Sequence, residues 1–172
     1  MTAIVAWHDR EQTVVVADRL ESGDNVRHIG GLPKIKKYGD FIIGAAGDSG
    51  SCNLLVHNDL PKKTSKQSDE RYIVSVLPRY WRKQATTESV DLSEVTVMVV
   101  GHSGIWTADG PGFGFSKVAS PYWAIGSGAE CALGALAAQR RTGSVTRRLQ
   151  QVVEIASRYV ASVGPDTDME AL

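Results

Sequence analysis

The sequence is poor in several features that usually reveal function, and each scarcity removes a class of protein from consideration. Only two cysteines occur among its 172 residues, Cys52 and Cys131, and they have no metal-ligand spacing. No apolar run approaches the roughly 20 residues that a membrane-spanning helix needs. Acidic and basic residues balance at 19 each, giving a formal net charge of zero. The sequence therefore gives no reason to expect binding to nucleic acid or to a membrane surface.

Other absences bear on the compartment in which the protein works, on its number of domains and on cofactors. The first residues contain no basic segment followed by a long apolar core, so we expect no secretory signal peptide. Together with the low cysteine content, this favours the cytoplasm, with both cysteines as small core residues on helices. No linker, internal repeat or low-complexity tract interrupts the chain, which predicts one domain over residues 1–172. No motif suggests a cofactor or a metal, and we expect neither.

The strongest positive signal lies at the start of the chain. A short apolar strand is predicted at Ala3–Trp7, and a second at Thr13–Ala17, ending on Asp18. The first strand begins so early that Thr2 would be held at the edge of the core, where chain termini are usually loose. If Met1 is removed, Thr2 carries a hydroxyl and a free α-amine on neighbouring atoms. Such a residue is a nucleophile with its own base.

The rest of the chain alternates groups of strands with pairs of helices. Apolar patterning predicts strands at 26–29, 41–47, 95–100, 105–107 and 122–126, and helices at 48–57, 69–84, 128–141 and 145–163, with a kink at Pro78. Apolar strands can form a core between two packed sheets, and an amphipathic helix must pack its apolar face against a sheet. We therefore predict an α+β fold, a four-layer αββα sandwich of two antiparallel sheets between helical layers.

Two charged residues could support a nucleophile at Thr2. Asp18 ends the strand next to the first one, and Lys34 lies near a proline and a glycine pair, in a segment that can pair with its neighbours. A buried lysine beside an aspartate would stay charged. It would then lower the basicity of a nearby hydroxyl and amine.

Several segments occur in a fixed order along the chain: Thr2-Ala3-Ile4-Val5-Ala6, Ala17-Asp18, Lys34, Gly44-Ala45-Ala46-Gly47 and Ile125-Gly126-Ser127-Gly128. At these spacings the set resembles the proteasome β-type branch of the N-terminal nucleophile hydrolases, especially the HslV-like peptidases. The resemblance covers nearly the whole chain, and it implies the four-layer fold predicted above. Each short segment is weak evidence by itself, whereas their order and spacing together are specific.

The resemblance also implies a catalytic mechanism. Thr2 Oγ1 would attack a peptide carbonyl while its α-amine takes the proton. Lys34, paired with Asp18, would supply positive charge near the nucleophile. The backbone N–H of Gly47 would stabilise the oxyanion, and Ser127 would bind the α-amine region.

The same resemblance implies how substrate binds and how the protein assembles. Ser22 and Gly23 would offer backbone groups to an extended peptide, and Ala45 would line a side-chain pocket open to medium apolar groups. The expected substrates are unfolded polypeptides or peptides. The expected partners are further copies of the chain, forming stacked homo-oligomeric rings, and an ATP-driven unfoldase that feeds the pore.

Two features favour an alternative, an inactive ring-forming or binding module on the same fold. Proteasome β subunits carry an aspartate three residues before a late serine. If Ser162 matches that serine, Tyr159 occupies the aspartate position. In addition, Thr2 has no free amine while Met1 is attached. N-terminal sequencing of the protein separates the alternatives.

Two serine motifs compete with Thr2 for the role of nucleophile. Gly47-Asp48-Ser49-Gly50 resembles the segment around a chymotrypsin-type serine, but helix-forming sequence follows it at once, and we expect Asp48 or Ser49 to be a helix cap. Gly101-His102-Ser103-Gly104 is one residue short of a nucleophile elbow. We interpret it as a turn between two strands.

Overall fold

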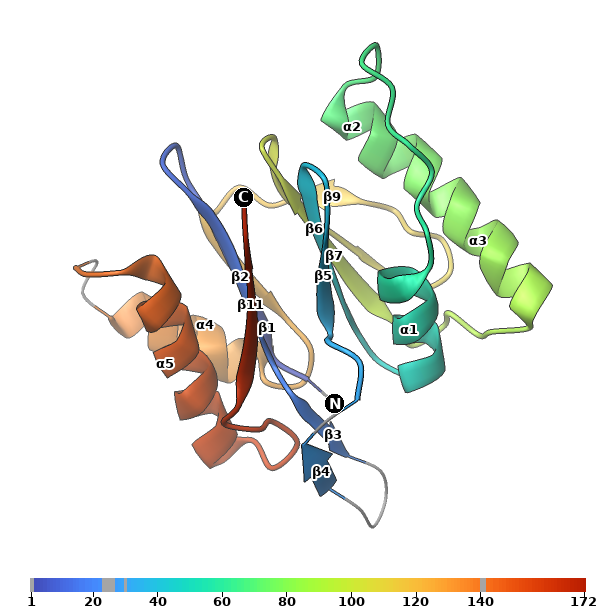
Figure 1. Ribbon diagram of the computed structural model, residues 1–172. Coiled ribbons are helices and arrows are strands. Elements are labelled where there is room, and N and C mark those ends of the chain that lie inside the picture. The colour runs from blue at the N-terminus through green and yellow to red at the C-terminus, as the bar shows by residue number, and fades with distance from the viewer. Residues whose placement is uncertain (1, 23–26, 30, 140–141) are drawn as a thin grey trace.

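Two antiparallel sheets lie face to face between two layers of helices, as Figure 1 shows. The computed structural model describes residues 2–22, 27–29, 31–139 and 142–172. The predicted α+β, four-layer αββα architecture is confirmed. No helix in these ranges is long and apolar enough to span a membrane.

The first sheet contains the amino-terminal strand at its centre. Its order is β10-β1-β2-β11, and all of its pairs are antiparallel. The strands are β1 (Ile4–His8), β2 (Thr13–Asp18), β10 (Tyr122–Ile125) and β11 (Thr167–Ala171). Because β1 has a partner on both sides, the residues just before it are fixed in place.

The second sheet follows the order β5-β6-β7-β8-β9, again antiparallel throughout. Its strands are β5 (Ile35–Tyr38), β6 (Phe41–Ala46), β7 (Thr96–Gly101), β8 (Gly104–Asp109) and β9 (Ser116–Lys117). A separate hairpin of β3 (Leu20–Ser22) and β4 (Arg27–Ile29) continues from β2 and projects from one end of the sandwich.

The helices cover the outer faces of the two sheets. The bounds are α1 (Ser49–His57), α2 (Asp69–Arg71), a π-helical segment η1 (Tyr72–Val76), α3 (Leu77–Glu88), α4 (Ala129–Ala138) and α5 (Val145–Tyr159). Residues of α4 and α5 pack on β1 and β2, whereas α1 and α3 pack on β6 and β7.

Strand alternation explains why the sandwich has layers. Along β1, Val5 and Trp7 contact the α4–α5 layer, whereas Ile4 and Ala6 point between the sheets. The same alternation along β2, β6 and β7 fills the space between the sheets with aliphatic side chains. Strands β1, β2, β6 and β7 are therefore buried on both faces over nearly their whole length, and each reads as an almost continuous apolar run.

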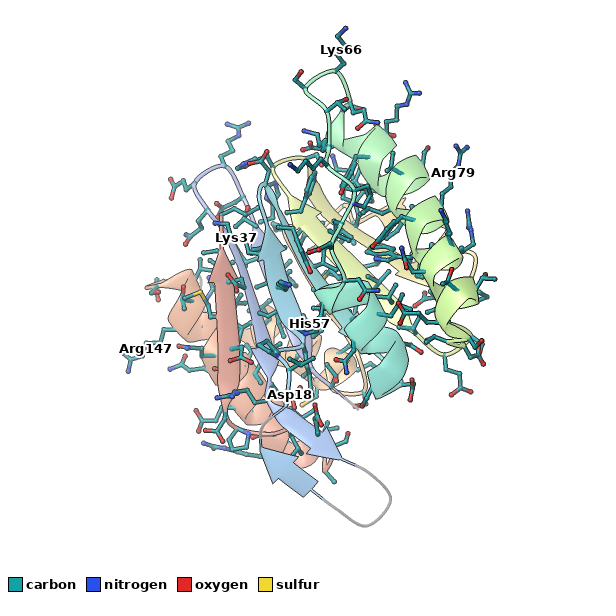
Figure 2. All side chains as sticks on the ribbon, turned by 45° about the vertical axis from the view of Figure 1, so that its right-hand side comes forward. Asp18, Lys37, His57, Lys66, Arg79 and Arg147 are labelled. Atoms are coloured by element: carbon teal, nitrogen blue, oxygen red, sulfur yellow. The ribbon has the colours of Figure 1, made fainter. Side chains whose placement is uncertain are left out.

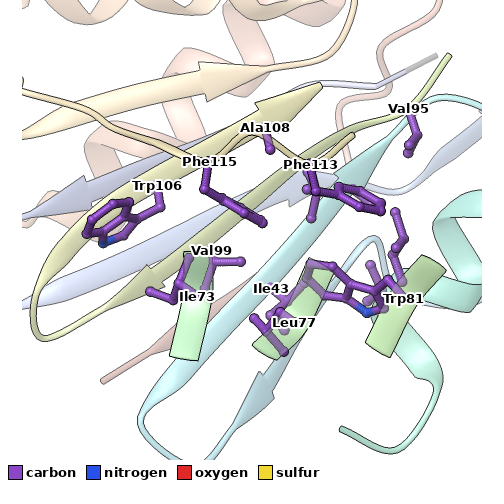
Figure 3. Packing of buried hydrophobic residues seen from close by; sticks show 14 of the residues in the cluster. Ile43, Ile73, Leu77, Trp81, Val95, Val99, Trp106, Ala108, Phe113 and Phe115 are labelled. Atoms are coloured by element: carbon purple, nitrogen blue, oxygen red, sulfur yellow. The ribbon is translucent and has the colours of Figure 1, made fainter. Parts of the chain in front are cut away.

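An aromatic cluster holds α3 against the second sheet. Trp81 is fully buried, and its ring lies 5.4 Å from the ring of Phe113 and 6.2 Å from that of Phe115. Figure 3 shows Leu77 and Trp81 projecting from α3 toward these rings. This packing fixes the outer helical layer on the sheet that carries β6.

Several local predictions need correction. Strands β3, β9 and β11 were not predicted, α4 ends at Ala138 rather than near residue 141, and α5 ends at Tyr159 rather than at residue 163. The helix predicted at 69–84 instead runs to Glu88 and contains a π-helical segment directly before Leu77 and Pro78. A proline has no N–H to donate and its ring crowds the preceding turn, which a widened turn accommodates.

Candidate active site

Thr2 sits at the start of β1, held by the turn that connects β10 to α4. Its backbone N–H donates to Ser127 Oγ at 3.1 Å, and its carbonyl accepts from the backbone N–H of Gly128 at 3.0 Å. Gly126 makes this approach possible, since it has φ +91° and a Cβ there would lie 2.2 Å from the Thr2 carbonyl oxygen. Thr2 is only 4% exposed.

Asp18 ends β2 and is fully buried at the base of the projecting hairpin, where Figure 2 labels it. Its Oδ1 accepts from the backbone N–H of Ala3 at 2.8 Å, directly beside Thr2. Its Oδ2 accepts from the backbone N–H groups of Leu20 and Gly164, both at 3.1 Å. The carboxylate thus connects β1, β3 and the segment after α5.

Lys34 lies just before β5 and reaches the same carboxylate. Its Nζ donates to Asp18 Oδ1 at 3.0 Å and to the Leu20 carbonyl at 2.7 Å, and its side chain is 12% exposed. The chain around it is anchored from α1, because His57 Nε2 donates to the Pro33 carbonyl at 2.7 Å. The buried carboxylate therefore places an ammonium group in the neighbourhood of Thr2.

Ser127 contacts a second serine, whose role the sequence alone did not settle. Its hydroxyl lies 3.0 Å from the hydroxyl of Ser162, which is buried. A continuous chain of hydrogen bonds therefore runs from the backbone N–H of Thr2 through Ser127 to Ser162. Tyr159, at the position of the expected aspartate, is 79% exposed at the end of α5 and does not join this network.

Gly47 follows β6 and faces the site from the second sheet. It has φ +145°, and a Cβ there would lie 2.4 Å from the Glu94 carbonyl oxygen, so a larger residue cannot occupy it without strain. The next residue, Asp48, caps α1 by accepting from the backbone N–H of Ser51 at 3.0 Å. Asp48, not Ser49, is the cap.

A hollow opens beside Thr2 and contains several of the predicted residues. Thr2, Lys34, Ala45 and Gly47 line it together. Cys52, half-buried on α1, also lines it, and burial raises the pKa of its thiol to about 11. Its position on α1 confirms the predicted helical placement of Cys52, whereas its place in this hollow was not predicted.

The remaining candidates are Ser22, Gly23, Ser49 and Ser103. Ser22 ends β3, and Gly23 lies outside the described residues. Ser49 is the first residue of α1 and lines the hollow, and none of the described residues around that hollow is a histidine. Ser103 lies in the turn between β7 and β8, where its hydroxyl accepts from the indole N–H of Trp106 at 3.3 Å.

No protein-family profile and no curated protein matches the amino-acid sequence. Solved structures do match. HslV from Trypanosoma brucei superposes with a TM-score of 0.73 at 18% identity, over 99% of this chain and 98% of that one. BPH of Thiobacillus denitrificans in complex with epoxomicin gives 0.76 at 16% identity, over 99% and 97%.

Anbu from Hyphomicrobium sp. strain MC1 gives a TM-score of 0.72 at 15% identity, over 99% of this chain and 81% of that one. Each of these superpositions covers 99% of this chain. The chain therefore has the fold of the HslV-like and proteasome-like N-terminal nucleophile proteins, as its sequence pattern indicates.

Proposed function

We propose that the protein is a threonine peptidase whose nucleophile is Thr2, released as the amino-terminal residue by removal of Met1. One observation carries the proposal. The Asp18 carboxylate binds the backbone N–H of Ala3 and the Lys34 ammonium through the same oxygen, at 2.8 and 3.0 Å. Forming a largely buried ion pair costs free energy, because both charges lose much of their hydration. Here the pair is placed beside the residue that can act as a nucleophile.

The proposed reaction has two steps. Thr2 Oγ1 attacks the peptide carbonyl carbon and its proton passes to the α-amine, which then protonates the departing amine of the substrate. The C–N bond breaks and an ester to Thr2 remains. A water molecule, deprotonated by the same amine, then attacks the ester, releases the carboxylic acid and restores the hydroxyl.

The surrounding residues have separate roles in this scheme. The Lys34 ammonium pairs with Asp18, and its positive charge favours the alkoxide form of Thr2. The Gly47 N–H stabilises the oxyanion, and Ser127, supported by Ser162, orients the α-amine. The hollow lined by Ala45 receives the side chain before the cleaved bond, while Ser22 and Gly23 bind the substrate backbone as an added strand.

We further propose that the protein works within stacked homo-oligomeric rings, and that an ATP-driven unfoldase supplies unfolded chains. The fold shared with HslV-like and proteasome-like proteins supports this proposal. A native mass well above that of a monomer is expected. A stable monomer at micromolar concentration would contradict the ring.

The experiment combines N-terminal sequencing with hydrolysis of small fluorogenic peptides. Protein purified from the native host should begin at Thr2 and cleave the peptides. Thr2→Ala should reduce turnover to background without unfolding the protein, and Thr2→Ser should keep partial activity because it retains the hydroxyl. Uniform retention of Met1 would sink the proposal and support the inactive module, which the exposed Tyr159 at the aspartate position favours.

A further inference from the structure

A second hollow adjoins Thr2 from the other side of strand β6. The first hollow extends toward β5, where Pro33 and Lys34 line it. The second extends toward β7, where it is lined by Glu94 and Thr96. Because β6 lies between β5 and β7 in the sheet, the two hollows flank the end of β6. Thr2 and Gly47 belong to both.

The junction of the hollows contains the reacting group of the proposed mechanism. Thr2 is 96% buried as a residue, since its exposed fraction is 4%, yet it lines both hollows. Within the described chain, its hydroxyl makes no hydrogen bond; the Thr2 contacts run through its backbone N–H and carbonyl. A hydroxyl without a partner among the described residues is available to bind a ligand at the junction.

The second hollow differs from the first in charge. Asp48 and Glu94 line it, and both also line an adjacent hollow that contains Asp91. None of the described residues that line these two hollows is a lysine, arginine or histidine. The backbone N–H of Ser51 lowers the pKa of Asp48, and the backbone N–H of Ser93 lowers that of Asp91, so both are ionised at neutral pH. The first hollow, by contrast, is lined by Lys34.

We propose that the hollow lined by Asp48 and Glu94 binds the residue that follows the cleaved bond, and that it prefers lysine or arginine there. The inference rests on the proposed peptidase function. If the side chain before the bond enters the hollow lined by Ala45, the chain after the bond must leave Thr2 on the other side of β6. There it meets two carboxylates with no cation beside them in the lining, which favour a positively charged side chain.

The test uses internally quenched peptides that differ only in the residue after the cleaved bond, which is arginine, its neutral isostere citrulline, or glutamate. The expected order of kcat/KM is arginine, citrulline, glutamate, with steps of about two- to fivefold, the range of exposed ion pairs. The preference should shrink as NaCl is raised, because salt screens exposed charges. Mass spectrometry of the products fixes the cleaved bond.

Three variants assign the preference to the hollow. Glu94→Gln should bring the arginine to citrulline ratio toward one, and Asp48→Asn should reduce it while still capping α1, since asparagine is an equally good cap. Glu70→Gln, an exposed site on α2, should leave it unchanged. Equal rates for arginine and citrulline in a reaction abolished by Thr2→Ala would overturn this inference alone. Absence of any cleavage that depends on Thr2 would overturn the proposed function itself.

Discussion

Replacing Asp18 by asparagine should cost about 3–5 kcal/mol of the free energy of unfolding, although the two side chains have nearly the same shape. Each carboxylate oxygen accepts two hydrogen bonds: Oδ1 from Ala3 N–H and Lys34 Nζ, and Oδ2 from Leu20 N–H and Gly164 N–H. An amide has one oxygen, so its NH₂ group must face one of these pairs of donors. Each buried donor left without an acceptor costs about 1–3 kcal/mol.

A double-mutant cycle with Lys34→Met separates the charge from the backbone contacts. In Asp18→Asn the Lys34 ammonium, 12% exposed, no longer faces the Asp18 carboxylate. The apolar methionine removes that ammonium. The double variant should therefore lose at least about 1 kcal/mol less than the sum of the single losses.

Urea unfolding at pH 7, followed by tryptophan fluorescence at one fixed protein concentration, measures these differences. Asp168→Asn is the matched control, because Asp168 pairs with Arg19 at 3.5 Å on the surface and should cost no more than about 1 kcal/mol. An Asp18→Asn protein as stable as this control would refute the idea that the buried carboxylate organises the site.

Three further predictions concern single positions. Lys34→Ala and Lys34→Arg should both abolish peptidase activity with ring assembly intact, since guanidinium does not replace an ammonium point charge; near-normal kcat in either would refute the role. Gly126→Ala should lower kcat/KM on the order of 100-fold, because the added methyl group would displace Thr2. Gly134→Ala is the control, because Gly134 lies on α4 with open space around it. It should increase the free energy of unfolding by about 0.5–1 kcal/mol and keep activity. Equal activity of these two glycine variants would count against the steric argument. Because burial raises the pKa of Cys52 to about 11, its alkylation should accelerate about tenfold per pH unit from pH 8 to 10, and the adduct should inhibit; fast alkylation at pH 7 would be inconsistent with that burial.

Elements with a strong apolar pattern were predictable from the sequence, and those without one were not. The apolar runs of β1, β2, β6 and β7 are buried on both faces, so composition alone identified them. Strand β11 reads Thr-Asp-Met-Glu-Ala, lies at a sheet edge and buries little, so its pairing with β2 through backbone groups left no apolar signal.

The contacts of the candidate site likewise divide into those that could be predicted from the sequence and those that could not. Thr2, Asp18 and Lys34 were grouped because their order and spacing resemble those of the HslV-like peptidases. The contacts of Ser162 with Ser127 and of Gly164 with Asp18 depend on how α5 returns to the sheet, 35 and 146 residues away in sequence. Glu94 lines the second hollow only because β7 pairs with β6. Such contacts are consequences of the tertiary fold and are not encoded in local pattern.

The central claim is that Thr2, with a free α-amine, is the nucleophile. The most direct measurement is peptide mapping by mass spectrometry after Met1-free protein is incubated with an epoxyketone, an electrophile that bridges a hydroxyl and the neighbouring amine. The account predicts one adduct per chain, on Thr2, and none in Thr2→Ala. An adduct on Ser49, or unmodified Thr2 in protein that cleaves peptides, would contradict it.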